Sequence, residues 1–270
     1  FNPINVIAPE KSFINARETA PCGGMAEVKF LIDSVVAAAM GQVVPEMSVG
    51  DLKGGANHIH IAGPRADGAT YIHYEWPAGG TGASLGVDGS NAVRSYNEGD
   101  FNSIQSVETV ESQYPLRVEC CEVRTGACGD GRYRGGFGLR RDIRILGDNA
   151  MLSVLSEKNV IPPYGVVKGC NAAANRFVVL RDGKEVEPSD VPGKVSGFTL
   201  QKGDVVREET AGGGGYGDPL TRDPKQVMED IRLGYLTIEQ AQLRYGLALT
   251  ESGKIDFDNQ IYLYNLNDAG

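Results

Sequence analysis

The chain has 270 residues, 41% of them hydrophobic and 23% charged, with a formal net charge of −9 at pH 7. This composition is that of an ordinary globular protein. No apolar run is long enough to cross a bilayer, and a nucleic-acid partner would need a basic face. The five cysteines show no C-x-x-C spacing and are typical of reduced thiols, so we expect a cytoplasmic protein.

The first strong pattern is an apolar stripe at helical spacing in residues 25–40. It predicts a helix that begins after Gly23-Gly24 and ends at Gly41, a residue suited to the C′ position. The stripe consists of Val28, Leu31, Ile32, Val35, Val36 and Ala39. We expect it to pack into the core.

The three histidines lie in two strand-like runs, NHIHIAG and TYIHYEW, joined by a hairpin-like GPRADG. His58 and His60 share one face of the first strand. His73 and Glu75 share one face of the second. If the strands pair and these side chains converge, they form a workable zinc or manganese set or a general acid and base. The alternative is that the histidines face solvent or a subunit interface.

Residues 77–100 are loop-rich and contain AGGTGA followed by DG. Gly79, Gly80 and Gly82 would let backbone N–H groups face an anion or a substrate carbonyl. Asp88 and Asn91 supply polar side chains beside them. The structural alternative is a long Ω-type loop closed by its own side chains. We expect a loop close to substrate.

Residues 114–146 predict a strand, a glycine-dense turn and a second strand, because apolar residues alternate on both sides of the turn. On the second strand Arg141 is the one exception to the alternation. Arg132 and Arg134 lie in the turn, and Arg forks suit planar anions. The simpler interpretation is a twisted hairpin whose arginines pair with its own acids. These acids are Glu119, Glu122 and Asp142.

Strand patterns continue from residue 150. One hairpin has Asp182-Gly183 at its tip, and a second turns at Lys202-Gly203-Asp204. These strands suggest a small barrel or sandwich. Residues 212–217 satisfy G-x-G-x-x-G, but Asp218-Pro219 interrupts the loop and no second parallel strand with an acidic tip follows, so we reject a dinucleotide site.

Two capped helices are predicted near the end of the chain. Asp223 with Pro224 starts one that ends at Gly234, and a capping box at Thr237 starts another. The sequence thus predicts an α+β fold, β-rich with glycine-rich loops, one N-terminal core helix and a short C-terminal helical region. We divide it into a mixed α/β part (1–112), a β-rich part (113–220) and a helical tail (221–270).

Several of these runs resemble the hydantoinase B family, whose chains carry ELR-x-x-SGGAG-x-x-RGG-x-G after a YPLR strand. The matching runs are YPLR (114–117), EVR (122–124) and GDGRYRGGFG (129–138), with AGGTGA (78–83) and DG (88–89) upstream and LSE (155–157), PYG (163–165), PGK (192–194) and GGGGYGDP (212–219) downstream. No single run is specific, but nine runs in the family's order are. The family includes acetone and acetophenone carboxylase large subunits and the matching half of 5-oxoprolinases.

The resemblance implies a subunit of an ATP-dependent enzyme that acts on a carbonyl. In such systems a partner of hydantoinase A type binds ATP and phosphorylates a carbonyl or enolate oxygen. The hydantoinase B chain then guides water attack on a cyclic amide, or carbon–carbon bond formation with carbon dioxide, with a divalent metal. We expect ring hydrolysis. The alternatives are a ketone carboxylase subunit, a non-catalytic scaffold, and a free-standing carbohydrate- or acid-binding module.

Hydantoinase B chains are about twice this long, and the resemblance covers their C-terminal half. Because the sequence opens at Phe1 without Met, we expect a fragment, a cleaved subunit or one portion of a larger polypeptide. The resemblance places the zinc or manganese ligands in the N-terminal half and does not call for histidines here. The expected partners are a hydantoinase A-type subunit, that N-terminal half and a small-molecule carbonyl substrate.

The expected site follows from these patterns. Substrate-binding residues are Gly79, Gly80, Gly82, Asp88 and Asn91. Arg132 and Arg134 hold the turn or an anion. The less favoured alternatives are His73 and Glu75 as acid and base, and His58, His60 and His73 as metal ligands.

Overall fold

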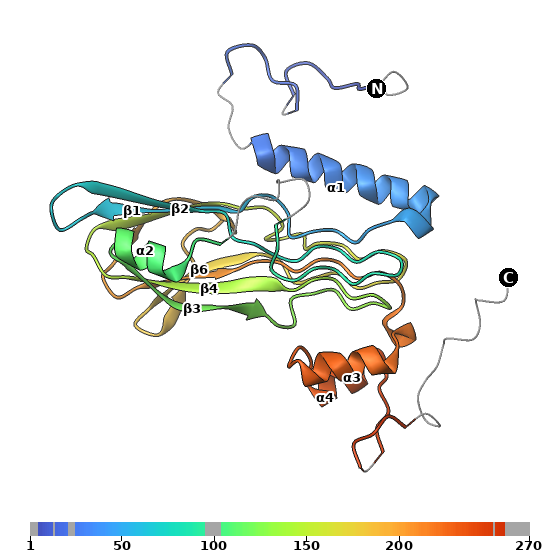
Figure 1. The fold of residues 1–270 in the computed structure, drawn as a ribbon. Coiled ribbons are helices and arrows are strands. Elements are labelled where there is room, and N and C mark those ends of the chain that lie inside the picture. Colours follow the sequence, from blue (N-terminus) through green and yellow to red (C-terminus); the bar gives the residue numbers. More distant parts are fainter. Residues whose placement is uncertain (1–4, 13, 21–24, 95–103, 251, 257–270) are drawn as a thin grey trace.

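The computed structural model describes residues 5–12, 14–20, 25–94, 104–250 and 252–256. Two antiparallel sheets form its centre (Figure 1). The first has the order β2-β1-β5-β8, from β1 (His58–Pro64), β2 (Thr70–Glu75), β5 (Ala150–Leu155) and β8 (Lys194–Leu200). The second has the order β3-β4-β9-β6-β7, from β3 (Leu116–Arg124), β4 (Gly138–Ile145), β6 (Arg176–Arg181), β7 (Lys184–Val186) and β9 (Val205–Glu209).

The sheets pack face to face over one apolar core, so the fold is a sandwich rather than a barrel. Ile59, Ile61 and Leu152 come from the first sheet, and Ile143 and Val206 from the second. The predicted α+β class is confirmed. Because β1 and β2 share a sheet with β5 and β8, segments 1–112 and 113–220 are joined within it.

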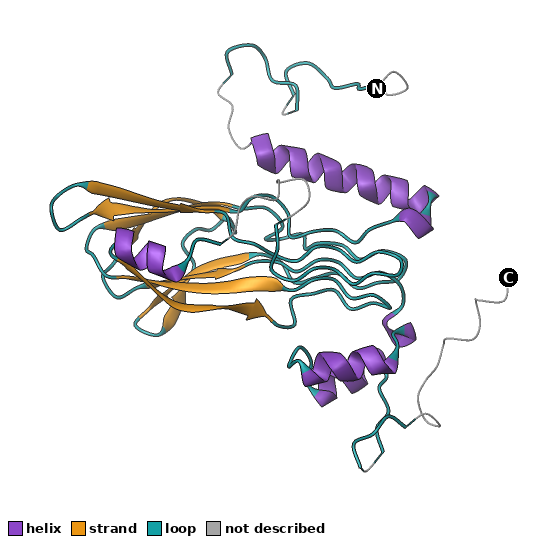
Figure 2. Ribbon diagram, viewed as in Figure 1, coloured by secondary structure: helices purple, strands orange, loops and turns teal. Residues whose placement is uncertain are grey.

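The helices are α1 (Met25–Val43), α2 (Val107–Gln113), α3 (Pro224–Arg232) and α4 (Ile238–Tyr245), with short 3-10 turns η1 (Pro45–Met47) and η2 (Pro219–Thr221). Of the helices, α2 lies against the strands, and α1, α3 and α4 lie beside the loop segments that extend them (Figures 1 and 2). Val110 of α2 enters the sandwich core, whereas α3 and α4 share a separate apolar cluster. None of the helices in the described ranges combines the length and hydropathy of a membrane span.

The predicted role of the first helix is wrong. α1 continues past Gly41 to Val43, and its apolar stripe points outward, with Val35 68% and Val36 55% exposed. The face turned inward carries Glu27, Phe30 and Ser34, and its two polar side chains meet backbone and a carboxylate. Glu27 accepts a hydrogen bond from the Ala56 N–H (3.0 Å), and Ser34 donates to Asp51 (2.8 Å).

The predicted hairpin at residues 202–204 is also wrong, although both of its strands exist. β8 pairs with β5 and β9 pairs with β4 and β6, so the chain crosses from one sheet to the other. Leu200 and Val205, on either side of the turn, are both buried. The Asp204 carboxylate fixes the crossing by accepting from Gln201 N (2.8 Å) and Arg181 (2.7 Å).

Other local predictions are confirmed. β1 pairs with β2, β3 with β4, and β6 with β7 across Asp182-Gly183, where both residues have positive φ. Asp223 caps α3 by accepting from Lys225 N, and Thr237 forms a capping box with Gln240 at the start of α4.

A bundle of extended segments continues from one end of the sandwich, drawn as parallel loops in Figure 2. It contains residues 49–53, 79–83, 88–91, 127–137, 163–172 and 210–217, and we call it the glycine bundle. Backbone hydrogen bonds join its members, among them Gly136 N to Thr81 O (2.9 Å) and Gly214 N to Asp51 O (2.8 Å). At Gly82 an added Cβ would lie 1.6 Å from a carbonyl oxygen, so only glycine permits this spacing.

Candidate functional site

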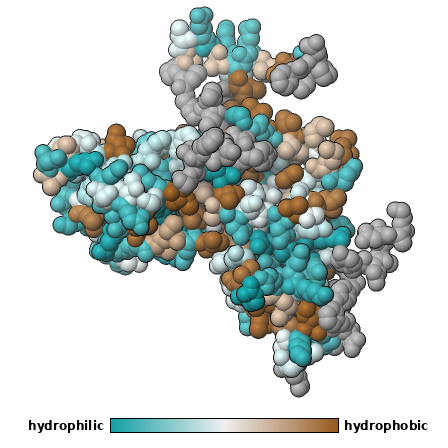
Figure 3. Space-filling model, viewed as in Figure 1, coloured by the Kyte–Doolittle hydropathy of each residue, from teal (hydrophilic) through white to brown (hydrophobic). Residues whose placement is uncertain are grey.

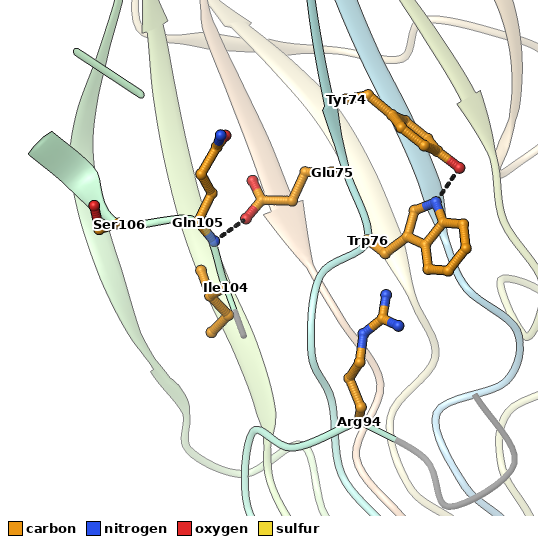
Figure 4. Close-up of a pocket in the computed structure, with 7 residues that line it drawn as sticks. All are labelled: Tyr74, Glu75, Trp76, Arg94, Ile104, Gln105 and Ser106. Atoms are coloured by element: carbon orange, nitrogen blue, oxygen red, sulfur yellow. Dashed lines mark hydrogen bonds between the residues drawn. The ribbon is translucent and has the colours of Figure 1, made fainter. Parts of the chain in front are cut away.

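A cavity of about 590 Å³ opens beside the end of β2 (Figure 4). Its lining residues are Tyr74, Glu75, Trp76, Arg94, Ile104, Gln105 and Ser106. They meet because β2 ends at Glu75 and residues 104–106 return beside it to begin α2, which Ser106 caps. The cavity is the candidate site, because a phenol, an indole and a guanidinium meet there beside a buried carboxylate.

A chain of hydrogen bonds ends at the phenol of this cavity. Glu27 Oε1 of α1 lies 3.1 Å from His58 Nε2. The other ring nitrogen, Nδ1, is hydrogen-bonded to the Tyr74 hydroxyl, which also accepts from the Trp76 indole N–H (Figure 4). With the proton on Nε2 facing Glu27, Nδ1 accepts from the phenol. We call Glu27, His58 and Tyr74 the relay, since a carboxylate, an imidazole and a hydroxyl in this order can move a proton.

The surroundings keep the Tyr74 phenol protonated. Burial raises the pKa of Tyr74 above its ordinary value of 10, against the opposing hydrogen bond from Trp76. His60 stacks on Tyr74 with ring centroids 4.3 Å apart, and burial, followed by the charge of His58, lowers the pKa of His60. Arg94 lies over the Trp76 ring at 4.7 Å. The wall therefore offers a neutral proton donor beside a cation.

A buried charge cluster lies behind the cavity and consists of Glu75, Arg141, Glu208 and His73. Arg141 donates to Glu75 and, through Nη2, to the Gln105 carbonyl at 2.9 Å. His73 Nε2 lies 3.5 Å from Glu75 Oε2. Because His73, Arg141 and Glu208 are fully buried, they can act on a bound solute through their field but not by contact.

Glu208 is the perturbed acid of this cluster. It lies opposite Arg141 in the pairing of β4 with β9, and its carboxylate oxygens have no hydrogen-bond partner among the described residues. Burial, and then the charge of Glu75, raise the pKa of Glu208 well above its ordinary 4.5. Burial therefore favours the neutral form of Glu208.

The structure does not bring the three histidines together. His60 pairs with Tyr74 and Ile61 with His73, so His73 and Glu75 point into the core while His58 and His60 lie on the opposite face. In the described ranges, no group of three or more His, Cys, Asp or Glu side chains could hold a metal ion. The described residues therefore offer no set of side chains that fits a divalent metal.

The glycines predicted to bind substrate lie in the glycine bundle. The Gly79 N–H donates to Val93 O (3.0 Å) and the Gly80 N–H to Ala211 O (3.0 Å), so both groups are already engaged. At Gly82 the added Cβ would meet the Gly50 carbonyl. Their closeness to a substrate stays a prediction.

Asp88, Asn91 and Arg134 meet in a second network, which docks α3 on the bundle. Asp88 accepts two hydrogen bonds from Arg222 (both 2.8 Å) and one from the Arg134 N–H (2.9 Å). The Arg134 side chain donates to Asp230 of α3 (3.1 Å) and to Asn91 (3.2 Å). Arg134 thus holds the turn in this structure.

The remaining arginines of the β3–β4 hairpin follow the simpler prediction. Arg144 pairs with Glu119, and Arg140 pairs with Glu122 (3.2 Å) and Asp142 (2.7 Å). Arg132 lies in the bundle, with its backbone N–H on Gly217 O and its guanidinium 5.8 Å from the Tyr133 ring.

Sequence reasoning missed several participants, which are Glu27, Tyr74, Trp76, Glu208, Arg222 and Asp230. Arg141 gave a usable signal, because a charge at an inward position of an alternating strand requires a buried partner. Glu208 sits at the equivalent position of its strand. No sequence signal pointed to Glu27, because its contact with His58 depends on how α1 packs.

The family model described as Hydantoinase B/oxoprolinase matches residues 1–219, and the chain belongs to this family. Among curated relatives, the chain is similar to the B component of a putative D-/L-hydantoinase from Pseudomonas sp. (strain NS671). The two are 29% identical over 259 residues, which cover 96% of this chain and 43% of that protein.

Two solved structures share the fold. The ATP-dependent caprolactamase from Pseudomonas jessenii aligns with a TM-score of 0.75 and 25% identity, over 93% of this chain and 44% of that chain. Nucleotide-free acetone carboxylase, at 21% identity, is similar in fold alone, with a TM-score of 0.63 over 77% of this chain and 32% of that chain. The chain therefore spans less than half the length of these relatives.

Proposed function

We propose that the chain is one part of an ATP-dependent enzyme that opens a cyclic amide by hydrolysis. The carrying observation is the family match over residues 1–219, supported by the shared fold with a caprolactamase, which is named for a cyclic amide. The other parts are an ATP-binding subunit of hydantoinase A type and the rest of the hydantoinase B-type subunit. A cytoplasmic location, with access to ATP, belongs to the same proposal.

The chemistry explains why ATP is needed. An amide carbonyl is a poor electrophile, so its oxygen attacks the γ-phosphorus of ATP in the partner subunit and ADP leaves. Water then adds to the activated carbon, the ring carbon–nitrogen bond breaks, and the nitrogen takes up a proton. A second water attacks the carbon of the resulting acyl phosphate, and phosphate leaves with the former carbonyl oxygen.

The relay supplies the proton for the departing nitrogen. Tyr74 lines the cavity and has a raised pKa, so its phenol is a neutral donor at pH 7. It gives its proton to the nitrogen. His58 then takes up a proton from solvent on Nδ1 and passes it to the Tyr74 oxygen, while its Nε2–H stays on Glu27. Any metal, zinc or manganese, is held by the rest of the subunit.

The glycine bundle serves as a rigid wall beside this chemistry. Gly79, Gly80 and Gly82 shape the wall through close backbone contacts, and Asp88 and Asn91 fix its outer edge. Substrate contact by these residues belongs to the proposal, as does an anion near Arg132.

The test uses the complex purified from its native cells. Ring opening of a hydantoin, 5-oxoproline or a lactam is followed by chromatography while ADP is measured in parallel. We expect product and ADP in equal amounts, and no product without ATP. Bicarbonate-dependent carboxylation of a ketone, in place of ring opening, would contradict the proposal and favour the carboxylase alternative.

A further inference from the structure

The outer face of α1 is a continuous apolar surface. Its members, with η1, are Ile32, Val35, Val36, Met40, Val43 and Met47, each between 48% and 78% exposed. They recur at the three- and four-residue spacing of a helix stripe along α1. Figure 3 shows hydrophobic atoms gathered in the upper right, where Figure 1 has α1. A folded chain rarely leaves such a stripe to water.

Two hollows border the stripe and widen it into a docking surface. One, of about 310 Å³, is lined by apolar side chains of α1 and by Ile14. The other, of about 420 Å³, lies between Val35 and the exposed loop residues Val160 and Ile161. Knobs from a partner segment can enter hollows of this kind, which a flat face does not offer.

We infer that this surface, the α1 face, binds the part of the hydantoinase B-type subunit that this chain does not span. The matched region is 43% of the hydantoinase component and 44% of the caprolactamase chain. In the caprolactamase the same fold therefore belongs to a polypeptide with more than half of its length outside it. That remainder is an occupant large enough to cover a 19-residue helix.

The same contact places the remainder beside the relay. Glu27 of the relay belongs to α1, on the face opposite the stripe, and reaches His58 from there. A partner that fixes α1 therefore also fixes the carboxylate of the relay. The inference depends on family membership and not on the reaction, so it can fail or hold independently of ring hydrolysis.

Photo-crosslinking in the native cells tests the inference. A benzoyl-phenylalanine is placed at Val35 or Met40, and in a control protein at Leu243, which is 84% exposed on α4. After digestion, we expect crosslinked peptides from the remainder of the hydantoinase B-type sequence at Val35 and Met40 but not at Leu243. Crosslinks to a second copy, to an unrelated protein or to nothing would overturn it.

A charge in the stripe gives a second, matched test. When the chain and the remainder are produced as separate polypeptides, Val35→Glu should lower co-purification of the remainder at least tenfold, whereas Leu243→Glu should leave it unchanged. Circular dichroism of both variants checks that the fold is kept. Equal recovery with Val35→Glu and Leu243→Glu would overturn the inference.

Discussion

Arg141 shows how one side chain can organise a buried site. It occupies a position on the inward face of β4 where the alternation predicts an apolar residue. There it lies between Glu75 of β2 and Glu208 of β9. A lone buried guanidinium would be strongly destabilising, so the Glu75 carboxylate that accepts from Arg141 is a requirement of the fold as much as a feature of the site. The Arg141–Glu75 pair also contributes to the electrostatic potential behind the cavity.

Glu208 gives a pH-dependent prediction. Since the pKa of Glu208 is raised in the fold, its ionisation opposes folding as pH rises above the unfolded value near 4.5. Glu208→Gln should therefore unfold with a free energy larger than wild type by more than about 1 kcal/mol at pH 8, and by little at pH 4. Urea titrations at both pH values measure this.

A surface acid serves as the control for Glu208. Glu187→Gln, at an exposed position, should change stability by less than about 0.5 kcal/mol at either pH. A Glu208→Gln protein that matches wild type at pH 8 would contradict the assignment of Glu208 as an acid held neutral by burial.

Substitutions of the relay residues can be compared with a substitution of His60, which lies on the same face of the sheet. Tyr74→Phe and His58→Gln should each lower kcat by about 10²- to 10⁴-fold in the complex, because proton transfer to the leaving nitrogen is lost. His60→Gln, which removes only a stacked ring, should retain activity within a few fold. A fully active Tyr74→Phe complex would contradict the role of the relay and favour the interpretation of this chain as a non-catalytic scaffold.

At the level of elements, the glycine bundle is built from contacts that side chains would block. A Cβ at Gly135 would lie 1.8 Å from the Gly213 carbonyl oxygen, whereas at Gly147 the nearest atom is 3.6 Å away. Gly135→Ala should therefore destabilise by about 3 kcal/mol or more, or prevent folding, and Gly147→Ala should be tolerated. Thermal unfolding distinguishes them, and equal melting temperatures would refute the tight packing.

The docking of α3 depends on Arg134. Arg134→Ala leaves Asp230 buried beside Arg222 alone, so we expect a loss of about 3–5 kcal/mol and faster hydrogen exchange in α3 and α4. Activity or assembly should fall much further than with Lys254→Ala, an exposed control. Unchanged exchange in α3 would show that the bundle holds it by other means.

Elements with local signals were predictable, and elements set by packing were not. The caps at Asp223 and Thr237 and the Asp182-Gly183 turn depend on neighbouring residues, and all three are present. The crossing at Gly203 and the outward stripe of α1 depend on which sheet or surface is nearby, which periodicity does not encode. Likewise, strand faces were predictable for His58 and His73, but their register was needed to show that they diverge.

As a whole, the described chain is a sandwich extended by the glycine bundle, with α1 on one side and α3 and α4 on another (Figure 1). The cavity lies at the end of β2 beside the start of α2, Glu27 of α1 reaches His58 next to it, and the apolar α1 face is left open to water. We expect a part of a larger enzyme to have an open cavity of this kind and an apolar surface left exposed.

The most direct test of this account follows the oxygen of the substrate carbonyl. A cyclic amide labelled with ¹⁸O at the carbonyl is turned over by the complex with ATP, and inorganic phosphate is analysed by mass spectrometry. The account predicts one labelled oxygen in each phosphate, since the carbonyl oxygen becomes the bridging oxygen before water attacks. Label that stays wholly in the ring-opened product, with unlabelled phosphate, would contradict it.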